Sequence, residues 1–409
     1  MNNQYTDFYS QVEGKLRAHS CSVMNTHRDA ALHLFATKGF PTRKVEEYRY
    51  TDVAHDFAPD FGIPLSLSPY KKTEFCCPIS QSPIDLTAYY NVLAGRSQDP
   101  VAALCTLLAS DGLLVYVPKG VRTPHPIQIS HILKGEQDTL LSRRILIIIE
   151  EGAQAEVIIT DKAAGTHHYL SNQVIEVFCQ KGSRLHLYEI EETNLMCTRY
   201  SNVFIHEAAN CSVQHTSITI HNGHSRNACR VQLTGEHAEV RLNGCVIADK
   251  MQHVDCNTLI EHLAPDCRSE ELYKYVMDDS SYGAFAGKVY VAPGAQGTSS
   301  SMTNSNLLAT RSARMLTQPM LEIYSDDVKC SHGSTVGQLN DQSLFYMQQR
   351  GISLDEARLL LKSAFITEVI EAIPLPALRD RLHYLVDARM RGQLSKCEGC
   401  NVCITPETK

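Results

Sequence analysis

The sequence contains no tryptophan, no long apolar run and no excess of basic charge. Its 38 Lys and Arg residues face 45 Asp and Glu residues, so a net charge of -7 provides no basic field for nucleic acid or anionic lipid. The longest apolar runs, at 113–117 and 145–149, are five residues long, far short of the roughly 18 that span a bilayer. We therefore expect no nucleic acid and no membrane among its partners.

Cysteine, in contrast, is abundant, with 15 residues spread over the chain. The first residues, 1–14, are polar and carry Asp7 and Glu13, so they lack the basic and apolar segments of a secretory signal. An odd number of cysteines without such a signal is typical of reduced cytosolic thiols. We therefore expect a cytoplasmic protein whose cysteines serve metal or sulfur chemistry rather than disulfides.

The chain is long enough, at 409 residues, for two or three domains with substantial cores. Its periodicity predicts an N-terminal helical region with a connector at 1–105, a β core at 106–337 and a C-terminal helical region at 338–409. In the first region, Asn25 is a candidate helix cap and Gly39 a candidate helix end. Several prolines interrupt the second half of this region, which we interpret as the connector.

The β core contains a loose repeat. Charged or small turns followed by alternating residues recur at positions 152, 182, 209 and 235, which are 30, 27 and 26 residues apart. This period is typical of a β-solenoid, whose coils bury their inner faces only by stacking on one another. A β-sandwich is the alternative at this point.

Helical signals return after residue 338. Ser353 and Glu356 form a capping box, and apolar residues that include Leu360 and Phe365 repeat at helical spacing until Pro374. Such an apolar stripe either packs on the core or docks a partner. We take Leu360 and Phe365 as candidate partner-binding residues.

A thiol and an imidazole lie two residues apart where the β core meets the C-terminal helices. In an extended segment Cys330 and His332 point to the same face, so that sulfur and nitrogen lie side by side for a metal such as iron. Two ligands make only half of a metal site. The alternative is a buried cysteine beside a surface histidine, and the spacing alone does not decide between them.

A second group of thiols, Cys397, Cys400 and Cys403, lies near the C-terminus. The C-x2-C-x2-C spacing is similar to the first three ligands of a bacterial ferredoxin cluster, but the fourth cysteine with its proline is missing. A complete four-thiolate cluster within this tail is therefore excluded. We keep the three cysteines as weaker metal candidates, beside the interpretation as a thiol-rich tail.

The segment around Cys330 resembles the signature of a known family. The run D-D-V-K-C-S-H-G-S-T-V-G at 326–337 is followed by L-F-Y at 344–346 and R-G-I at 350–352. With these motifs the chain resembles, over most of its length, the SufB/SufD family of iron-sulfur cluster assembly proteins. SufB-type chains carry a cysteine and a glutamate where this chain has Asn304 and Gly333, so the resemblance is to the SufD type.

The resemblance implies a right-handed parallel β-helix flanked by helical regions, in agreement with the solenoid prediction. It implies a non-catalytic scaffold that pairs with a SufB-type paralogue through the β-helices and binds a SufC-type ABC ATPase through the C-terminal helices. On the matching positions, His332 would be a ligand or the point where iron enters, with Cys330 as its neighbour, and the transient iron-sulfur cluster or iron would be shared with SufB. Whether the isolated chain forms a homodimer stays open.

Two other functions compete with this interpretation. A β-solenoid enzyme, for example a carbohydrate-active or acyl-transfer enzyme, would need acids or bases clustered on one coil face, and the sequence offers no such cluster. An electron carrier would use the C-terminal cysteines and predicts a stable chromophore in the isolated chain. Neither accounts for the motif at 330–337.

Overall fold

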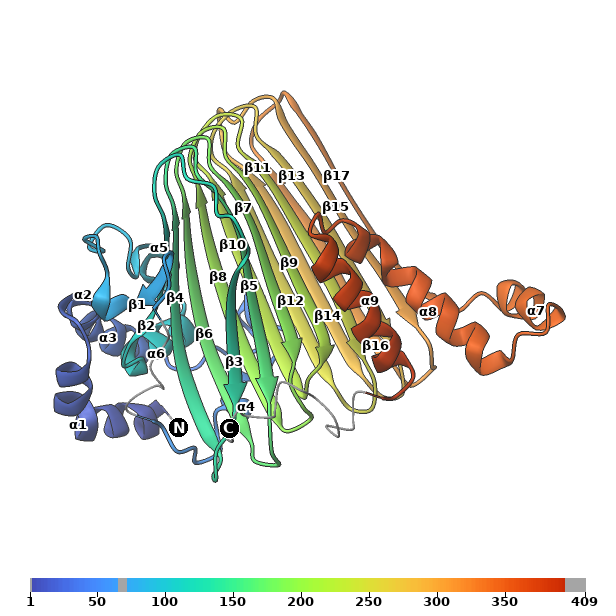
Figure 1. Ribbon diagram of the computed structural model, residues 1–409, viewed down its shortest axis with the longest axis horizontal. Helices are drawn as coiled ribbons and strands as arrows, with labels where there is room; N and C mark the ends of the chain where they lie inside the picture. Colours follow the sequence, from blue (N-terminus) through green and yellow to red (C-terminus); the bar gives the residue numbers. More distant parts are fainter. Residues whose placement is uncertain (1, 65–71, 394–409) are drawn as a thin grey trace.

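The computed structural model describes residues 2–64 and 72–393 of the chain. Three parts follow one another along its longest axis: a group of N-terminal helices, a solenoid of stacked strands and a set of C-terminal helices (Figure 1). The expectation of a mainly β chain with a parallel β-solenoid between two helical regions is confirmed. None of the helices in the described ranges is both long and apolar enough to cross a membrane.

The solenoid consists of two sheets. Nine strands form one sheet in the order β1-β2-β4-β6-β8-β10-β12-β14-β16, and the odd-numbered strands from β3 to β17 form the other. Apart from the antiparallel pair of β1 and β2, neighbouring strands are parallel. In chain order the solenoid strands are β2 (Gly112–Val117), β3 (Ile127–Leu133), β4 (Thr139–Ile149), β5 (Gln154–Ala163), β6 (Tyr169–Cys179), β7 (Arg184–Glu192), β8 (Cys197–Glu207), β9 (Ser212–His221), β10 (His224–Leu233), β11 (Glu239–Ala248), β12 (His253–His262), β13 (Arg268–Met277), β14 (Tyr282–Val291), β15 (Thr298–Leu308), β16 (Arg314–Ile323) and β17 (Val328–Gln338).

Side chains that point between the two sheets are aligned in files along the solenoid axis. Because parallel strands pair in register, one residue of each coil lies directly beside its counterpart in the next coil. One apolar file is built from Ile147, Val177, Ile205, Val231 and Ile260. All five belong to one continuous buried core that fills the space between the sheets.

The N-terminal region packs on the nine-stranded sheet. Its helix α6 (Pro100–Leu108) contacts β4 and β6 and is buried over its full length. The stretch that we interpreted as a connector is thus a packed part of the region, and the prediction missed α6 because a helix buried on all sides has no amphipathic period. The other elements are α1 (Asn2–His19), α2 (Ser22–Thr26), α3 (Arg28–Lys38), η1 (Glu46–Tyr48), α4 (Val53–Asp56), β1 (Cys76–Pro78), η2 (Ile79–Gln81) and α5 (Val92–Ser97).

For helix α3, the predicted C-terminal end is confirmed and the predicted N-terminal cap is wrong. Gly39 ends α3 with a φ of 64°, a conformation that glycine adopts without strain. The residue at the N-terminal cap is His27, and Asn25 instead accepts a hydrogen bond from Nε of Arg28 at 3.0 Å. The cap prediction was therefore wrong because the turn α2 precedes α3 and takes up Asn25.

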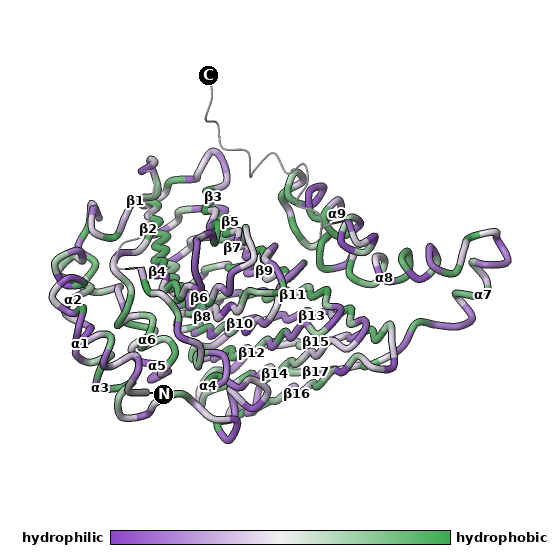
Figure 2. Tube along the Cα trace, turned by 90° about the horizontal axis from the view of Figure 1, so that it is seen from below, coloured by the Kyte–Doolittle hydropathy of each residue, from purple (hydrophilic) through white to green (hydrophobic). Residues whose placement is uncertain are grey.

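The C-terminal region comprises α7 (Asp341–Gln349), α8 (Leu354–Glu371) and α9 (Pro376–Met390). The Ser353 hydroxyl caps α8 by accepting a hydrogen bond from the Glu356 backbone N–H at 3.3 Å, as predicted. The second half of α8 buries Ile366 and Ile370 together with α9 against the eight-stranded sheet. α7, in contrast, projects away from the solenoid (Figures 1 and 2).

Candidate metal site at the open end of the solenoid

Cys330 and His332 lie on β17, the last strand of the eight-stranded sheet. β17 pairs with β15 so that Cys330 lies beside Ser300 and His332 beside Met302. Ser300 and Met302 point into the solenoid and are only 4% and 1% exposed. Cys330 and His332 therefore continue two inward-facing files and point to the same face, as expected for residues two apart on a strand.

The solenoid is open at this end. In the part of the chain that the structure describes, β17 pairs with β15 alone and β16 pairs with β14 alone. The last coil is not covered by a further one there, so that His332 is exposed, whereas Cys330 is half-buried against the interior core. We call the inward-facing side chains of β16 and β17 at this end the mouth.

The mouth has an apolar flank and a polar flank. On the apolar flank, Leu321 and Val328 pack, like Cys330, against the interior core. On the polar flank, the hydroxyls of Ser334 and Thr317 form a hydrogen bond of 2.7 Å that joins the two sheets. His332 lies between Cys330 and Ser334 on the same face of β17 and so separates the two flanks.

The mouth provides two different ligand types. Burial raises the pKa of the Cys330 thiol, although the Ser300 backbone N–H, which is hydrogen-bonded to the sulfur, acts in the opposite direction. Within residues 2–64 and 72–393, no group of three or more His, Cys, Asp or Glu side chains is placed to hold a metal ion. One thiol and one imidazole suit iron, but a complete coordination sphere requires further ligands from outside this mouth.

Two residues near this pair do not add ligands to it. Glu322 accepts a hydrogen bond of 2.9 Å from the ammonium group of Lys288 on the outer surface, so it does not join the Cys330 and His332 pair. Gly333 faces open space. The weaker metal candidates Cys397, Cys400 and Cys403 lie outside the described residues.

The two candidate partner-binding residues of α8 lie in different surroundings. Leu360 is 40% exposed. Phe365 packs against the solenoid core under α8, where the Lys274 ammonium group lies 5.0 Å from its ring centre and donates a hydrogen bond to its backbone carbonyl. Only Leu360 therefore offers a free apolar side chain to a partner, and the role of both residues stays a prediction.

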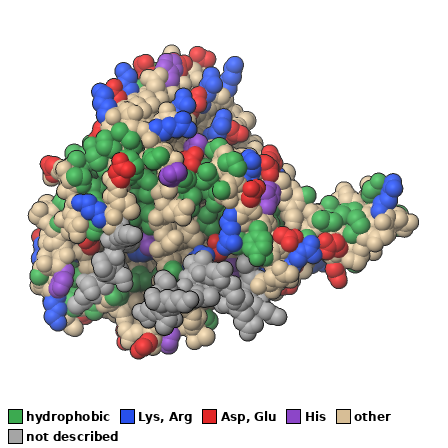
Figure 3. All heavy atoms as spheres, viewed as in Figure 1, with side chains coloured by type: hydrophobic (Ala, Val, Ile, Leu, Met, Phe, Trp, Pro, Cys, Tyr) green, Lys and Arg blue, Asp and Glu red, His purple; other side chains and the backbone are tan. Residues whose placement is uncertain are grey.

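Two aromatic residues on α7 are more exposed than either. Phe345 is 63% and Tyr346 59% exposed, and the Arg350 guanidinium lies 5.2 Å from the Tyr346 ring centre. Figure 3 shows apolar side chains on the projecting C-terminal arm. In the sequence these residues stood out only as part of the L-F-Y motif, although adjacent aromatics in a short polar helix are a signal of an exposed contact surface.

Two models of known protein families match the chain. "SUF system FeS cluster assembly, SufBD core domain" matches residues 131–365, which contain most of the solenoid and the whole mouth. The chain belongs to the SufBD family. "SufBD protein N-terminal region" matches residues 1–87 and 79–129, so that both the solenoid and the helices in front of it are typical of the SufBD family.

The chain is also similar in sequence to several curated proteins. The chain is 26% identical to "Iron-sulfur cluster assembly protein SufD" of Escherichia coli (strain K12) over 87% of this chain and 90% of that protein. It is 30% identical to "Protein ABCI7, chloroplastic" of Arabidopsis thaliana over 67% of this chain and 59% of that protein. It is also 25% identical to "Iron-sulfur cluster assembly protein SufB" of Bacillus subtilis (strain 168) over 72% of this chain and 63% of that protein.

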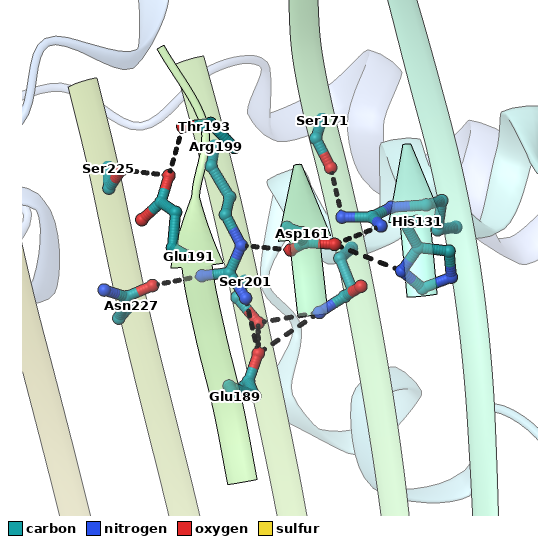
Figure 4. Close-up of polar contacts among 12 residues, drawn as sticks. His131, Asp161, Ser171, Glu189, Glu191, Thr193, Arg199, Ser201, Ser225 and Asn227 are labelled. Carbon is teal, nitrogen blue, oxygen red and sulfur yellow. Dashed lines mark hydrogen bonds and ion pairs between the residues drawn. The ribbon is translucent and has the colours of Figure 1, made fainter. Parts of the chain in front are cut away.

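The interior of this SufBD-family solenoid also holds a buried ion network that sequence analysis missed. Asp161 on β5 accepts hydrogen bonds of 2.6 Å from both Arg143 on β4 and Arg199 on β8, and Arg199 also reaches Glu189 on β7 at 2.6 Å. His131 lies 3.1 Å from Asp161. Figure 4 shows the side chains of His131, Asp161, Arg199 and Glu189 turned toward one another.

The network is held together by charge. Burial raises the pKa of Asp161, but Arg143 and Arg199 outweigh it and hold that pKa well below the usual value. In the same way, Arg199 and His215 outweigh the effect of burial and lower the pKa of Glu189 to about 2. Since these residues are buried and paired, we assign the network to the framework of the solenoid interior.

Proposed function

We propose that this chain is a non-catalytic scaffold subunit of the SUF system that presents Cys330 and His332 to iron or to a growing iron-sulfur cluster. The observation that carries the proposal is the position of this pair: two inward-facing ligands at the open end of a solenoid whose interior is otherwise filled. Membership of the SufBD family supports it. The cluster is cargo here, and an imidazole ligand, which binds iron less firmly than a thiolate, favours its release.

The partner at the mouth is a SufB-type paralogue in this proposal. Among the described residues, no further strand pairs with the outer edges of β16 and β17, and such edges pair readily with strands of another chain. Apolar side chains lie exposed on these two strands, with Leu316 at 42%, Ile323 at 38% and Val336 at 46%. A paralogue of the same fold continues both sheets and adds the ligands that the mouth lacks. A homodimer of the isolated chain would use the same edges.

A SufC-type ATPase docks on the C-terminal helices in this proposal. Phe345, Tyr346 and Leu360 supply the exposed apolar surface. α8 is tied to the solenoid by ion pairs of Lys362 with Asp278, at 3.0 Å, and of Lys274 with Glu368. A force on α8 therefore reaches β13, two strands away from the mouth strand β17 in the same sheet.

We also place the protein in the cytoplasm. The 12 cysteines within the described residues are all free thiols, as expected in a reducing compartment. Iron-sulfur chemistry requires such thiols to stay reduced, because oxidation removes them as ligands.

The test measures iron and acid-labile sulfide in the complex purified anaerobically after co-expression with SufB-type and SufC-type partners. His332→Ala and Cys330→Ala are compared with Ser331→Ala, a change at the exposed, outward-facing residue between them. We expect the first two to lose iron and sulfide while the complex stays assembled, and Ser331→Ala to keep both. Full retention by both inward-facing variants would overturn the assignment of the site.

The pairing has its own test. Val336→Lys places a charge on the inward face of β17, whereas Thr335→Lys places it on the outward face of the same strand. We expect Val336→Lys to reduce recovery of the SufB-type partner and Thr335→Lys to leave it closer to wild type. Native mass spectrometry of the purified complexes reads out the composition, and equal recovery with both variants would contradict pairing through the mouth.

A further inference from the structure

A line of three buried polar side chains runs through the interior of the solenoid and ends at Cys330. His262 is 0% exposed, Ser269 5% and Ser300 4%. His262 Nε2 lies 2.8 Å from Ser269 Oγ, and Ser269 Oγ lies 2.7 Å from Ser300 Oγ. Cys330 is the next residue in the file that contains Ser269 and Ser300.

This line crosses a part of the interior that is apolar in the other coils apart from buried Glu207, which precedes Leu233 in the file of His262. The file of the two serines holds Leu185, Val213 and Val240 in the preceding coils. The facing file of the other sheet places Leu233 and Val291 on either side of His262. A buried hydroxyl or imidazole is unfavourable here unless hydrogen bonds compensate it. In the file of the two serines, polar residues replace the apolar ones in the coils directly behind the thiol of the mouth.

The hydrogen bonds have one direction. Ser269 donates its hydroxyl hydrogen to Ser300, so that Ser269 Oγ accepts a hydrogen from His262 Nε2. This assigns the proton of the neutral imidazole to Nε2, which agrees with the lack of a partner at the buried Nδ1 atom in the structure. Ser300 accepts the hydrogen bond from Ser269 and therefore keeps its own hydroxyl hydrogen for a further acceptor.

The next polar atom along the file is the sulfur of Cys330. The Ser300 backbone N–H already lies toward this sulfur. The Ser300 side chain lies in the same inward-facing file as Cys330, so its hydroxyl is the nearest side-chain donor along that file. Donors of this kind interact more strongly with a charged acceptor than with a neutral one. A thiolate, free or bound to iron, is therefore the state of Cys330 that Ser300 favours.

We propose that Ser300 is a positioning residue for Cys330: its hydroxyl, oriented by Ser269 and His262, donates a hydrogen bond to the Cys330 sulfur in the thiolate state. The inference rests on the proposed function, in which this sulfur is a ligand. Hydrogen bonds to ligand sulfur change the electron donation to iron and the stability of the cluster. Ser300 thereby tunes how readily the mouth accepts and releases its cargo.

The first experiment measures the alkylation rate of Cys330 by iodoacetamide in the anaerobic full-length chain, at one fixed pH, by mass spectrometry of the peptide. Ser300→Ala is compared with Ser301→Ala, which removes an exposed hydroxyl from the neighbouring, outward-facing residue of β15. We expect Ser300→Ala to slow alkylation about tenfold, the effect of one hydrogen bond to a charged group, and Ser301→Ala to match wild type.

Two further variants separate positioning from packing. Ser300→Thr keeps the hydroxyl and should restore most of the rate, whereas Ser269→Ala leaves the Ser300 hydroxyl without its orienting donor and should give an intermediate rate. Equal rates for Ser300→Ala and Ser301→Ala, or failure of Ser300→Thr to restore the rate, would overturn the inference. A faster reaction of Ser300→Ala would also overturn it, because this would reflect only easier access to the sulfur.

The second experiment measures iron and sulfide in the anaerobic complex that carries Ser300→Ala. We expect partial loss of both, smaller than in Cys330→Ala. If Cys330→Ala retains the cluster while Ser300→Ala still slows alkylation, the proposed function fails and the hydrogen bond stands. If Cys330→Ala loses the cluster and Ser300→Ala alters neither readout, the site stands and the positioning role fails.

Discussion

Gly287 and Met302 face each other across the solenoid interior, one coil behind His332. A Cβ atom at Gly287 would lie 2.7 Å from the Met302 sulfur and 2.8 Å from Cζ of Phe285, so that glycine leaves the space that the methionine fills. Met302 in turn lies directly beside His332 in the register of β15 and β17. Gly287 on the nine-stranded sheet thus allows Met302 to pack directly behind His332.

Substitution of Gly287 should therefore disturb both the core and the mouth. Gly287→Ala inserts a methyl group where Met302 lies, and overpacking of this kind destabilises a protein by about 1–3 kcal/mol. Gly333→Ala is the matched control, since nothing lies within 4 Å of a Cβ atom there. Urea unfolding should show the loss for Gly287→Ala and a change within about 0.5 kcal/mol for Gly333→Ala. Equal unfolding free energies would contradict this account of the core.

Glu271 makes the stability of the solenoid depend on pH. Burial raises the pKa of this carboxyl to about 7, against the lowering effect of the hydrogen bond that Thr258 donates to it at 2.7 Å. Between its unfolded pKa of about 4.5 and about 7 the folded protein holds a proton that the unfolded chain has lost, so stability falls as the pH rises through this range.

Glu271→Gln removes this penalty. Each unit of pKa shift corresponds to about 1.4 kcal/mol, so the variant should be more stable than wild type at pH 8, by up to about 3 kcal/mol, and close to wild type at pH 5. Glu270→Gln, a change at the exposed neighbouring residue, should show no such difference between the two pH values. Denaturant titrations at both pH values measure the effect, and a Glu271→Gln variant that gains nothing at pH 8 would refute it.

Asp161 is the centre of charge in the interior ion network. Asp161→Asn leaves Arg143 and Arg199, both 3% exposed in their side chains, without their shared carboxylate. Removal of one partner from a buried ion network typically costs about 3–5 kcal/mol, and we expect a loss of this size in the free energy of unfolding. Glu192→Gln tests a half-buried ion pair with Lys162 at 3.6 Å and should cost less than about 1 kcal/mol. Similar losses in both variants would contradict the central role of Asp161.

The exposed apolar surface of the C-terminal helices should matter for binding but not for folding. Phe345→Glu and Leu360→Glu should each weaken the SufC-type partner about tenfold or more, as expected for apolar residues inside an interface, with unchanged thermal unfolding of the isolated chain. Val45→Glu, at a residue that is 40% exposed in the N-terminal region, is the control. Binding is measured by titration of purified partners, and wild-type affinity of both helix variants would exclude this surface.

Phe365 provides a contrast within the same helix. Because its ring packs between α8 and the solenoid next to Lys274, Phe365→Glu should lower the thermal stability as well as the affinity for the partner. The difference between Leu360→Glu and Phe365→Glu in thermal unfolding therefore separates a docking residue from a packing residue. Equal stability of the two variants would contradict the packing seen for Phe365.

The repeat of the solenoid could be predicted because some of its turns are marked by glycine. Gly152 and Gly182 adopt φ values of 68° and 70°, as left-handed turn residues do. In the following coils the same conformation is adopted by Asn210, His237 and Asp266, with φ between 58° and 60°. These residue types are also common in other loops, so the turns of these coils cannot be recognised from sequence. The positions 209 and 235 that we assigned from sequence therefore precede the structural turns at Asn210 and His237 by one and two residues.

The position of Cys330 and His332 on one face followed from their spacing, but the partners behind them did not. Ser269, Ser300 and Cys330 are about 30 residues apart from one to the next and meet only through strand register. The ion network could not be predicted either. Asp161 and Arg199 are 38 residues apart, lie on different sheets and meet only in the solenoid interior. Strand β6 shows a further limit: it is buried along its full length, so alternation of polar and apolar residues vanishes.

Because the coils stack in register, the length of the solenoid increases by a constant amount with each coil. Each coil adds one strand to each sheet, and neighbouring strands are about 4.8 Å apart. The distance between the N-terminal helices and the mouth is therefore set by the number of coils and not by the identity of the residues within them (Figure 1). Insertion or deletion of a whole coil between β7 and β12 would change the reach of the molecule in fixed steps. It would also displace the contacts of Glu46 with Lys288 on β14 and of Tyr50 with Gln318 on β16, which connect the N-terminal region to the strands near the mouth.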